Sequence, residues 1–265
     1  MKKSLRYIVA AVLAITAITT QAQVQFCGYD INPGQTYTKS DFSQIKSGSF
    51  KLSSNGSYLE LNNLVAEHNN WMFYFKHTND VVLNFVGEST LTTTGNSTGT
   101  IVFSAPSSGY RNVTVTGDKV NFVNTYSSGG AAFAYIYNCH ITIEDCYLKA
   151  TTTNQNNDRY SVATDINEHM STTSLVTINN STVIGNTFLN LKDLELKHCN
   201  YATPRSYVSL ETYSTGHKRL MTNGEYVKGF IILPDDQLKD GDVNFDGKVN
   251  VSDVTALVNK ILGIK

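Results

Sequence analysis

Twelve residues near the C-terminus, 242–253, carry side-chain oxygens at a spacing that suits a hard cation. Loop positions 1, 3, 5, 9 and 12 bear side-chain oxygens and position 7 offers its backbone carbonyl, which makes the candidate ligands Asp242, Asn244, Asp246, Lys248, Asn250 and Asp253. Gly247 occupies the sixth position, where a sharp turn favours a residue without Cβ. The spacing predicts a Ca²⁺ site in preference to a merely acidic turn.

The segment from Gly241 to Gly263 resembles one half of a type I dockerin, an EF-hand-like module that docks secreted carbohydrate-active proteins onto cohesin domains. As in dockerins, the last ligand position holds Asp rather than Glu. The resemblance implies a calcium-binding unit over residues 235–265 and a cohesin-like domain as a candidate partner. A dockerin normally has two such units, whereas this sequence contains one.

Behind the loop, apolar residues recur at positions i, i+3, i+4, i+7 and i+8 of a short helix: Val254, Leu257, Val258, Ile261 and Leu262. Gly263 can end this helix. Because five apolar side chains in water would form an exposed patch, we expect the helix to dock. It would dock on the end or flank of the preceding domain or on a cohesin-like partner.

The first 22 residues have the organisation of a secretory signal peptide. Lys2, Lys3 and Arg6 precede an apolar run over residues 7–18, and small residues at 20 and 22 suit a signal peptidase. The run is too short for a membrane span, which needs about 20 apolar residues. We therefore expect a mature chain from Gln23 that is secreted or displayed at the cell surface.

Composition narrows the classes of partner. Charged residues make up 16% of the chain and the formal net charge is −1, so there is no basic footprint for nucleic acid or an anionic membrane. Few prolines and abundant Thr, Ser, Asn and Tyr favour a β-rich domain over residues 23–234.

The body repeats a short phrase, an apolar-x-apolar pair followed five residues later by another apolar or aromatic residue. Its clearest copies begin at Val113, Ile141, Val176 and Leu194. Each copy indicates a strand, a turn and a second strand, and a recurring unit that cannot bury its own face must stack on its neighbours. We predict an all-β, right-handed parallel β-helix followed by the short calcium loop-helix unit. The alternative is an antiparallel sandwich, which also has short alternating strands.

Segments 58–63, 82–90 and 138–148 resemble secreted pectate-lyase-type β-helix proteins in their apolar pattern, without a catalytic motif. This resemblance implies the fold and export more than an activity.

Four cysteines remain after the signal peptide: Cys27, Cys139, Cys146 and Cys199. Cys146 and Cys199 share one place in the repeat, with Ser181 between them, so stacking would hold them about 10 Å apart, beyond disulfide reach. We interpret these two as small core residues. Cys139 could pair with Cys146 around one turn, and Cys27 is free or paired elsewhere.

The aligned outward positions offer no repeated carboxylate. One column contains Thr116, Glu144, Asn179 and Lys197, and the next contains Gly117, Asp145, Asn180 and His198. A lyase or glycosidase usually needs acidic residues on neighbouring strands and a basic residue in the same groove. The best remaining binding candidates lie in the polar loop 154–173 and are Asp158, Arg159, Asp165, Glu168 and His169.

Aromatic residues favour carbohydrate binding. Trp71, Phe73 and Phe75 alternate with Met72, Tyr74 and Lys76, so one face of this strand can be core while Tyr74 reaches out. Exposed aromatic rings stack on sugars, and the alternative is that Trp71 is simply buried. Two classes of function remain. The first is an exported, non-catalytic, glycan-associated protein with a calcium-binding dockerin-like tail for assembly or docking in polysaccharide utilisation. The second is a small polysaccharide lyase or glycoside hydrolase with the same tail.

Overall fold

The computed structural model describes residues 24–76, 80–95, 99–104, 109–126, 131–152, 162–165, 174–188, 191–204, 207–214, 217–237, 241 and 249–262. Strands make up most of this part of the chain, and a 3₁₀ turn and one α-helix follow them near the C-terminus. The predicted all-β class is confirmed. The predicted signal peptide, residues 1–22, lies outside the described residues.

Twelve strands form the larger sheet, in which the neighbours from β5 to β16 and from β5 to β15 run parallel. Its two ends pair antiparallel, through β3 and β4 at the start and through β21 at the finish. The strands are β3 (Thr36–Tyr37), β4 (Ile45–Leu52), β5 (Tyr58–His68), β7 (Val81–Thr93), β9 (Arg111–Asn124), β11 (Cys139–Glu144), β12 (Tyr147–Thr152), β14 (Leu175–Asn179), β15 (Thr182–Gly185), β16 (Asp193–Lys197), β17 (Cys199–Thr203) and β21 (Phe230–Pro234).

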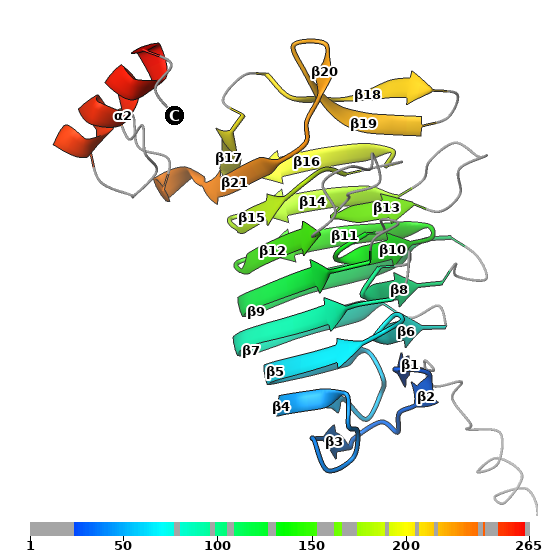
Figure 1. Cartoon of the computed structure of the whole chain (residues 1–265). Coiled ribbons are helices and arrows are strands. Elements are labelled where there is room, and N and C mark those ends of the chain that lie inside the picture. The colour runs from blue at the N-terminus through cyan, green and yellow to red at the C-terminus, as the bar shows by residue number, and fades with distance from the viewer. Residues whose placement is uncertain are drawn as a thin grey trace, which may run out of the picture.

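Six short strands form a smaller sheet, which is parallel from β6 to β13. They are β1 (Val24–Phe26), β2 (Tyr29–Asp30), β6 (Phe73–Phe75), β8 (Ile101–Phe103), β10 (Ala134–Ile136) and β13 (Ala163–Asp165). The chain alternates between the sheets, so β7, β8, β9 and β10 follow one another as long, short, long and short strands (Figure 1). We call one long strand segment with its following short strand a rung.

The core lies between the two sheets, as the sequence alternation dictates. Along β9, Val113, Val115, Val120 and Phe122 are buried and the residues between them are partly or fully exposed, because successive side chains in a strand point to opposite faces. From the smaller sheet, Phe73, Phe75 and Phe103 meet these apolar side chains in one continuous cluster. Burial of this shared face holds each rung against the next.

The turn inside each repeated phrase uses left-handed backbone. Asp145, Asn180 and His198 have φ values of 48°, 44° and 50° at equivalent places, and Gly117 has 103°. The side-chain amide of Asn180 donates to the Asp145 carboxylate at 2.6 Å, which links successive turns. The pairing of Glu144 with Asn179, and of Asn179 with Lys197, confirms the aligned column predicted from the phrase.

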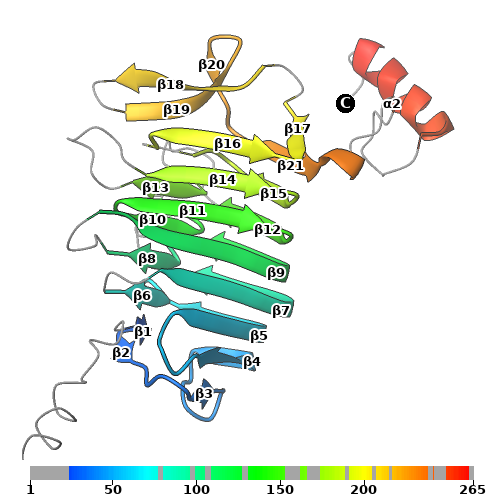
Figure 2. The ribbon, with the colours of Figure 1, turned by 180° about the vertical axis from the view of Figure 1, so that it is seen from behind.

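The last rung is covered by a three-stranded antiparallel sheet made of β18 (Ser209–Ser214), β19 (His217–Thr222) and β20 (Glu225–Tyr226). Both views place it over β16 (Figures 1 and 2). Leu220 is buried there and Leu210 packs on the core. This sheet shelters the end of the core from water.

The helix α2 (Val251–Leu262) follows the 3₁₀ turn η1 (Asp235–Gln237) and stands away from the sheets (Figures 1 and 2). Its apolar stripe is exposed, with Ile261 at 73% and Leu262 at 64% of full exposure. The expected docking on the end or flank of the preceding domain is therefore not what the structure shows. The helix is held at its start by capping bonds rather than by burial of its stripe.

The turn glycines give a test of the stacking. A Cβ at Gly117 would collide with the Phe85 backbone of the neighbouring strand, whereas Gly224, also at positive φ, has open space around it. We expect Gly224→Ala to cost about 1 kcal/mol through backbone strain alone. Gly117→Ala adds the collision and should cost about 2–4 kcal/mol. Chemical denaturation of both variants measures the difference, and equal losses would show that the rungs separate easily.

Candidate functional site

Most of the polar-loop candidates cannot be placed. Asp158, Arg159, Glu168 and His169 lie outside the described residues. The backbone of Asp165 ends β13 and pairs with Ile136, and its side chain is not described. The predicted cluster of these five side chains therefore lies outside what the structure describes.

The predicted calcium loop is described at its end. Asp242, Asn244, Asp246 and Lys248 lie outside the described residues. Asn250 and Asp253 form a reciprocal cap on α2. The Asn250 side-chain oxygen accepts from the Ser252 amide at 2.7 Å, and the Asp253 carboxylate accepts from the Asn250 amide at 2.7 Å.

Asp253 is only 3% exposed although its helical neighbours are exposed. A buried carboxylate is costly unless hydrogen bonds or a cation compensate it. Gly241 has a φ of 91°, and a Cβ there would come within 3.2 Å of Val249, so these two residues, on either side of 242–248, lie close together. An oxygen-only ligand set fits Ca²⁺.

An aromatic pair lies on the outward face of the smaller sheet. Phe73 and Phe75 are buried and Tyr74 is partly exposed, as the alternation predicts. Trp71 is partly exposed, with its ring centroid 5.2 Å from that of Tyr74. Asn70 accepts from the Trp71 amide at 2.8 Å, and the ring of His68 contacts the Trp71 carbonyl at 3.2 Å. These contacts fix the Trp71 backbone at the start of β6.

A third aromatic residue extends this face along the stack. Tyr74 pairs with Val102, and Val102 pairs with Tyr135, which is partly exposed. Two strand spacings put the Tyr74 and Tyr135 positions about 10 Å apart. We call Trp71, Tyr74 and Tyr135 the aromatic face. The sequence analysis did not identify Tyr135. The pattern that could have indicated it is the short three-residue strand that recurs at 73–75, 101–103 and 134–136.

The outward face of the larger sheet carries mixed polar residues in columns. The register places Glu60, Asn84, Thr116, Glu144, Asn179 and Lys197 in one column. Glu60 and Glu144 are three strands apart, about 14 Å. Acid and base carboxylates of glycosidases lie about 5–9.5 Å apart. This spacing does not form such a pair.

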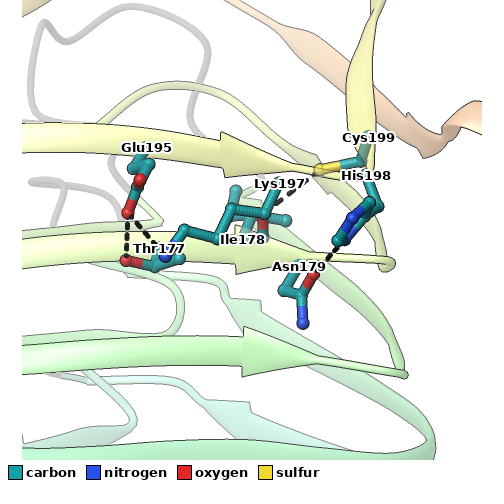
Figure 3. Close-up of polar contacts among 7 residues, drawn as sticks. All are labelled: Thr177, Ile178, Asn179, Glu195, Lys197, His198 and Cys199. Atoms are coloured by element: carbon teal, nitrogen blue, oxygen red, sulfur yellow. Dashed lines mark hydrogen bonds and ion pairs between the residues drawn. The ribbon is translucent and has the colours of Figure 1, made fainter.

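At the end of these columns, short-range contacts join the last two strands (Figure 3). Glu195 pairs with Lys197 at 3.2 Å and accepts from the Thr177 hydroxyl at 3.3 Å. The ring of His198 contacts the Asn179 side chain at 3.0 Å. The exposed ion pair lies within β16 and contributes about 0–1 kcal/mol, whereas the contacts of Thr177 and Asn179 join β14 to β16 and to the turn after it.

Arg111 illustrates a cation that is unavailable to ligands. Its side chain is fully buried, donates to the Phe75 carbonyl at 3.2 Å and lies 5.9 Å from the Phe103 ring centroid. Burial lowers the pKa of its guanidinium. Arg111 is therefore a structural residue of the core, where it links β9 to the smaller sheet.

A small hollow on the larger sheet was not anticipated from the sequence. It has a volume of about 310 Å³ and is lined by Lys51, Ser53, Ser54, Tyr58 and Glu60. Burial, with a smaller contribution from Glu60, raises the pKa of the Tyr58 hydroxyl. These residues come from the antiparallel strands β4 and β5 and from the turn between them, where Asn55-Gly56 was a local hairpin signal.

No family model, curated protein or solved structure matches this chain. Among the described residues, no helix is long and apolar enough to cross a membrane.

The cysteines do not form nucleophilic sites. All four are buried and free, so the Cys139–Cys146 pairing considered from the sequence is not formed. Cys146 stacks next to Ser181, as the repeat predicts, and the Cys146 backbone amide donates to the Ser181 hydroxyl at 3.2 Å. Burial raises the pKa of the Cys27 and Cys146 thiols to about 12, so both stay protonated at neutral pH.

Thiol labelling should report this burial. We expect the native protein to react slowly with a thiol reagent at pH 8, because thiolate is the reacting form and access is blocked. Before labelling, the protein should have the mass of the fully reduced chain. In guanidinium chloride all four thiols should react. Rapid labelling of the folded protein, or a mass lowered by the two hydrogens that one disulfide removes, would contradict the buried and reduced state of the cysteines.

Proposed function

We propose that this chain is an exported, non-catalytic, glycan-associated protein with a calcium-binding dockerin-like tail. The aromatic face is the observation that carries the proposal. Trp71 and Tyr74 lie side by side on the outward face of the smaller sheet, where both are partly exposed, and the side chains of Asn70 and His68 contact the Trp71 backbone. Aromatic rings presented in this way offer apolar faces to the C–H faces of sugar rings and keep a polar edge available.

The scaffold we propose is a right-handed parallel β-helix. In support, successive rungs pair parallel and in register in both sheets, from β6 to β13 and from β5 to β16. An antiparallel sandwich would join consecutive strands through hairpins instead. A right-handed path is favoured because crossovers between parallel strands are almost always right-handed.

The outward face of the larger sheet, a different surface from the aromatic face, supports binding of a neutral glycan over its cleavage. Threonine and asparagine side chains such as Asn84, Thr116 and Asn179 occupy the outward columns, where they offer hydrogen bonds without charge. Glu60 and Glu144 are too far apart in their column for acid–base cooperation on one glycosidic bond. A rigid stack also presents its aromatic face with little ordering cost on binding.

Removing the indole tests the glycan proposal. We expect Trp71→Ala to weaken retention on neutral plant or host polysaccharides about tenfold or more in affinity electrophoresis, since a stacking face is lost. Tyr110→Ala is the matched control, because Tyr110 is 46% exposed and stacks on His140 over the larger sheet. Equal retention by all three proteins would contradict the proposal. Release of reducing ends or unsaturated products from the same panel would favour the lyase or hydrolase alternative.

The calcium proposal for the tail depends on the capped start of α2. Asp253 is buried, and one of its oxygens already accepts from the Asn250 amide. We propose Asp242, Asn244, Asp246, the Lys248 carbonyl, Asn250 and Asp253 as the ligands, with assembly through the exposed stripe of α2 on a cohesin-like partner. Bound Ca²⁺ would neutralise carboxylates crowded into one loop.

Titration of the tail measures this directly. We expect saturable heat on addition of millimolar Ca²⁺ by calorimetry, together with a higher melting temperature for the tail, because a ligand that binds only the folded form stabilises it. Asp246→Ala should abolish both effects. Asp235→Ala, an exposed acidic residue of η1 outside the loop, should change neither. Identical titrations for the wild type and Asp246→Ala would exclude this ligand set.

A further inference from the structure

The larger sheet has a step at its C-terminal end. Beyond β9 the larger sheet continues as two halves. β11 and then β14 stack on the first part of β9, and β12 and then β15 stack on its second part. At the third level β16 lies on β14, but the place on β15 is taken by β21, which pairs antiparallel with it. β17 is thereby lifted to a fourth level, where it pairs with β21.

This step leaves one edge of β16 unpaired. β14 pairs with all five residues of β16 through one edge, and within the described residues no strand pairs with the other. Alternate backbone groups of a strand point to opposite edges, so the unpaired edge presents amide donors and carbonyl acceptors in a row. A strand added to this edge would lie at the fourth level, where β17 already continues the other half of the sheet.

A cleft of about 590 Å³ lies along this edge. It is bounded by β16, β17 and the hairpin β18–β19, and its apolar lining includes Leu194, Leu196, Val208, Leu210 and Leu220. Tyr207, which is 82% exposed, stands at its rim. The Lys218 ammonium donates to the Lys192 carbonyl at 2.9 Å and so fastens the hairpin at the start of β16.

The combination favours one kind of occupant. Leu194 and Leu196 face the core side and remain partly exposed, which marks the end of the buried columns. Asp193, Glu195 and Lys197 point outward and are exposed. A single extended strand could use the free backbone groups and cover the leucines with alternate apolar side chains, whereas a sugar or a compact apolar molecule would use only one of these features.

We propose that the cleft binds an extended peptide, which adds to β16 as the next strand of the larger sheet. The peptide presents apolar side chains at alternate positions to the cleft and uncharged or basic side chains outward beside Glu195. This site is separate from the aromatic face and from the calcium loop. It gives the chain a means to capture an unfolded segment or tail of another protein.

A peptide that copies residues 174–180, Ser-Leu-Val-Thr-Ile-Asn-Asn, is a suitable probe because β14 already fits between two strands of this sheet. We expect saturable binding of the labelled peptide by fluorescence anisotropy and slower hydrogen exchange in residues 193–197. Two further peptides, each N-methylated at one set of alternate amides, separate the edges. One should bind about tenfold or more weakly and the other like the parent, since only one edge of the peptide meets β16.

Protein variants locate the site. Ser209→Trp should fill the cleft and abolish binding while the melting temperature stays close to that of the wild type, because Ser209 lines the cleft and is only partly buried. Trp71→Ala should bind the peptide normally. The proposal is overturned if the parent peptide does not bind, if both methylated peptides bind like the parent, or if a neutral oligosaccharide rather than the peptide protects residues 193–197.

Discussion

In-register parallel pairing between rungs is the constraint on which this structure depends. It sets equivalent residues of successive rungs about 4.8 Å apart, so every side chain has a near-copy of its position above and below. Apolar columns such as Val115 on Ile143, and Ile143 on Ile178, gain from this repetition. Charged columns would repel, which accounts for the threonines and asparagines that fill the outward positions between isolated charges.

The same constraint selects the turns. A strand that must bend at the same place in each rung needs left-handed backbone there, and Asn, Asp and Gly adopt it at low cost. Asp145 and Asn180 meet this requirement and also bond to each other across rungs. Gly117 meets it where the Phe85 backbone approaches too closely for any Cβ. Polar residues at these corners are therefore explained by backbone geometry before any ligand is considered.

The long strands and their register could be predicted from the sequence because alternation with a fixed turn sets both period and alignment. The columns through Glu144, Asn179 and Lys197 follow from that rule. Tyr135 could not be aligned with Tyr74, since loops of unequal length separate the three-residue strands of the smaller sheet. The insertion of β21 had no local signal either, because the apolar run Phe230–Pro234 does not specify its partner or its direction. Of the calcium ligands, only Asn250 and Asp253 can be compared with the structure, where they cap a helix.

A stack of this kind has no intrinsic length, so its ends must be built by residues that break the repeat. At the N-terminal end the chain turns antiparallel through β4 and β3, and Phe26, Phe42 and Phe50 close the core with packed rings. At the other end the closure is made by a returning strand and a hairpin, which cover different halves of the last rung. Because β21 covers only the β15 half, the apolar columns beneath β16 are sheltered by side chains of the hairpin and not by backbone pairing. The unpaired edge of β16 is thus a direct consequence of how the repeat is ended. Among the described residues, the amides and carbonyls of this edge have no partner strand, unlike those of the strands inside the stack.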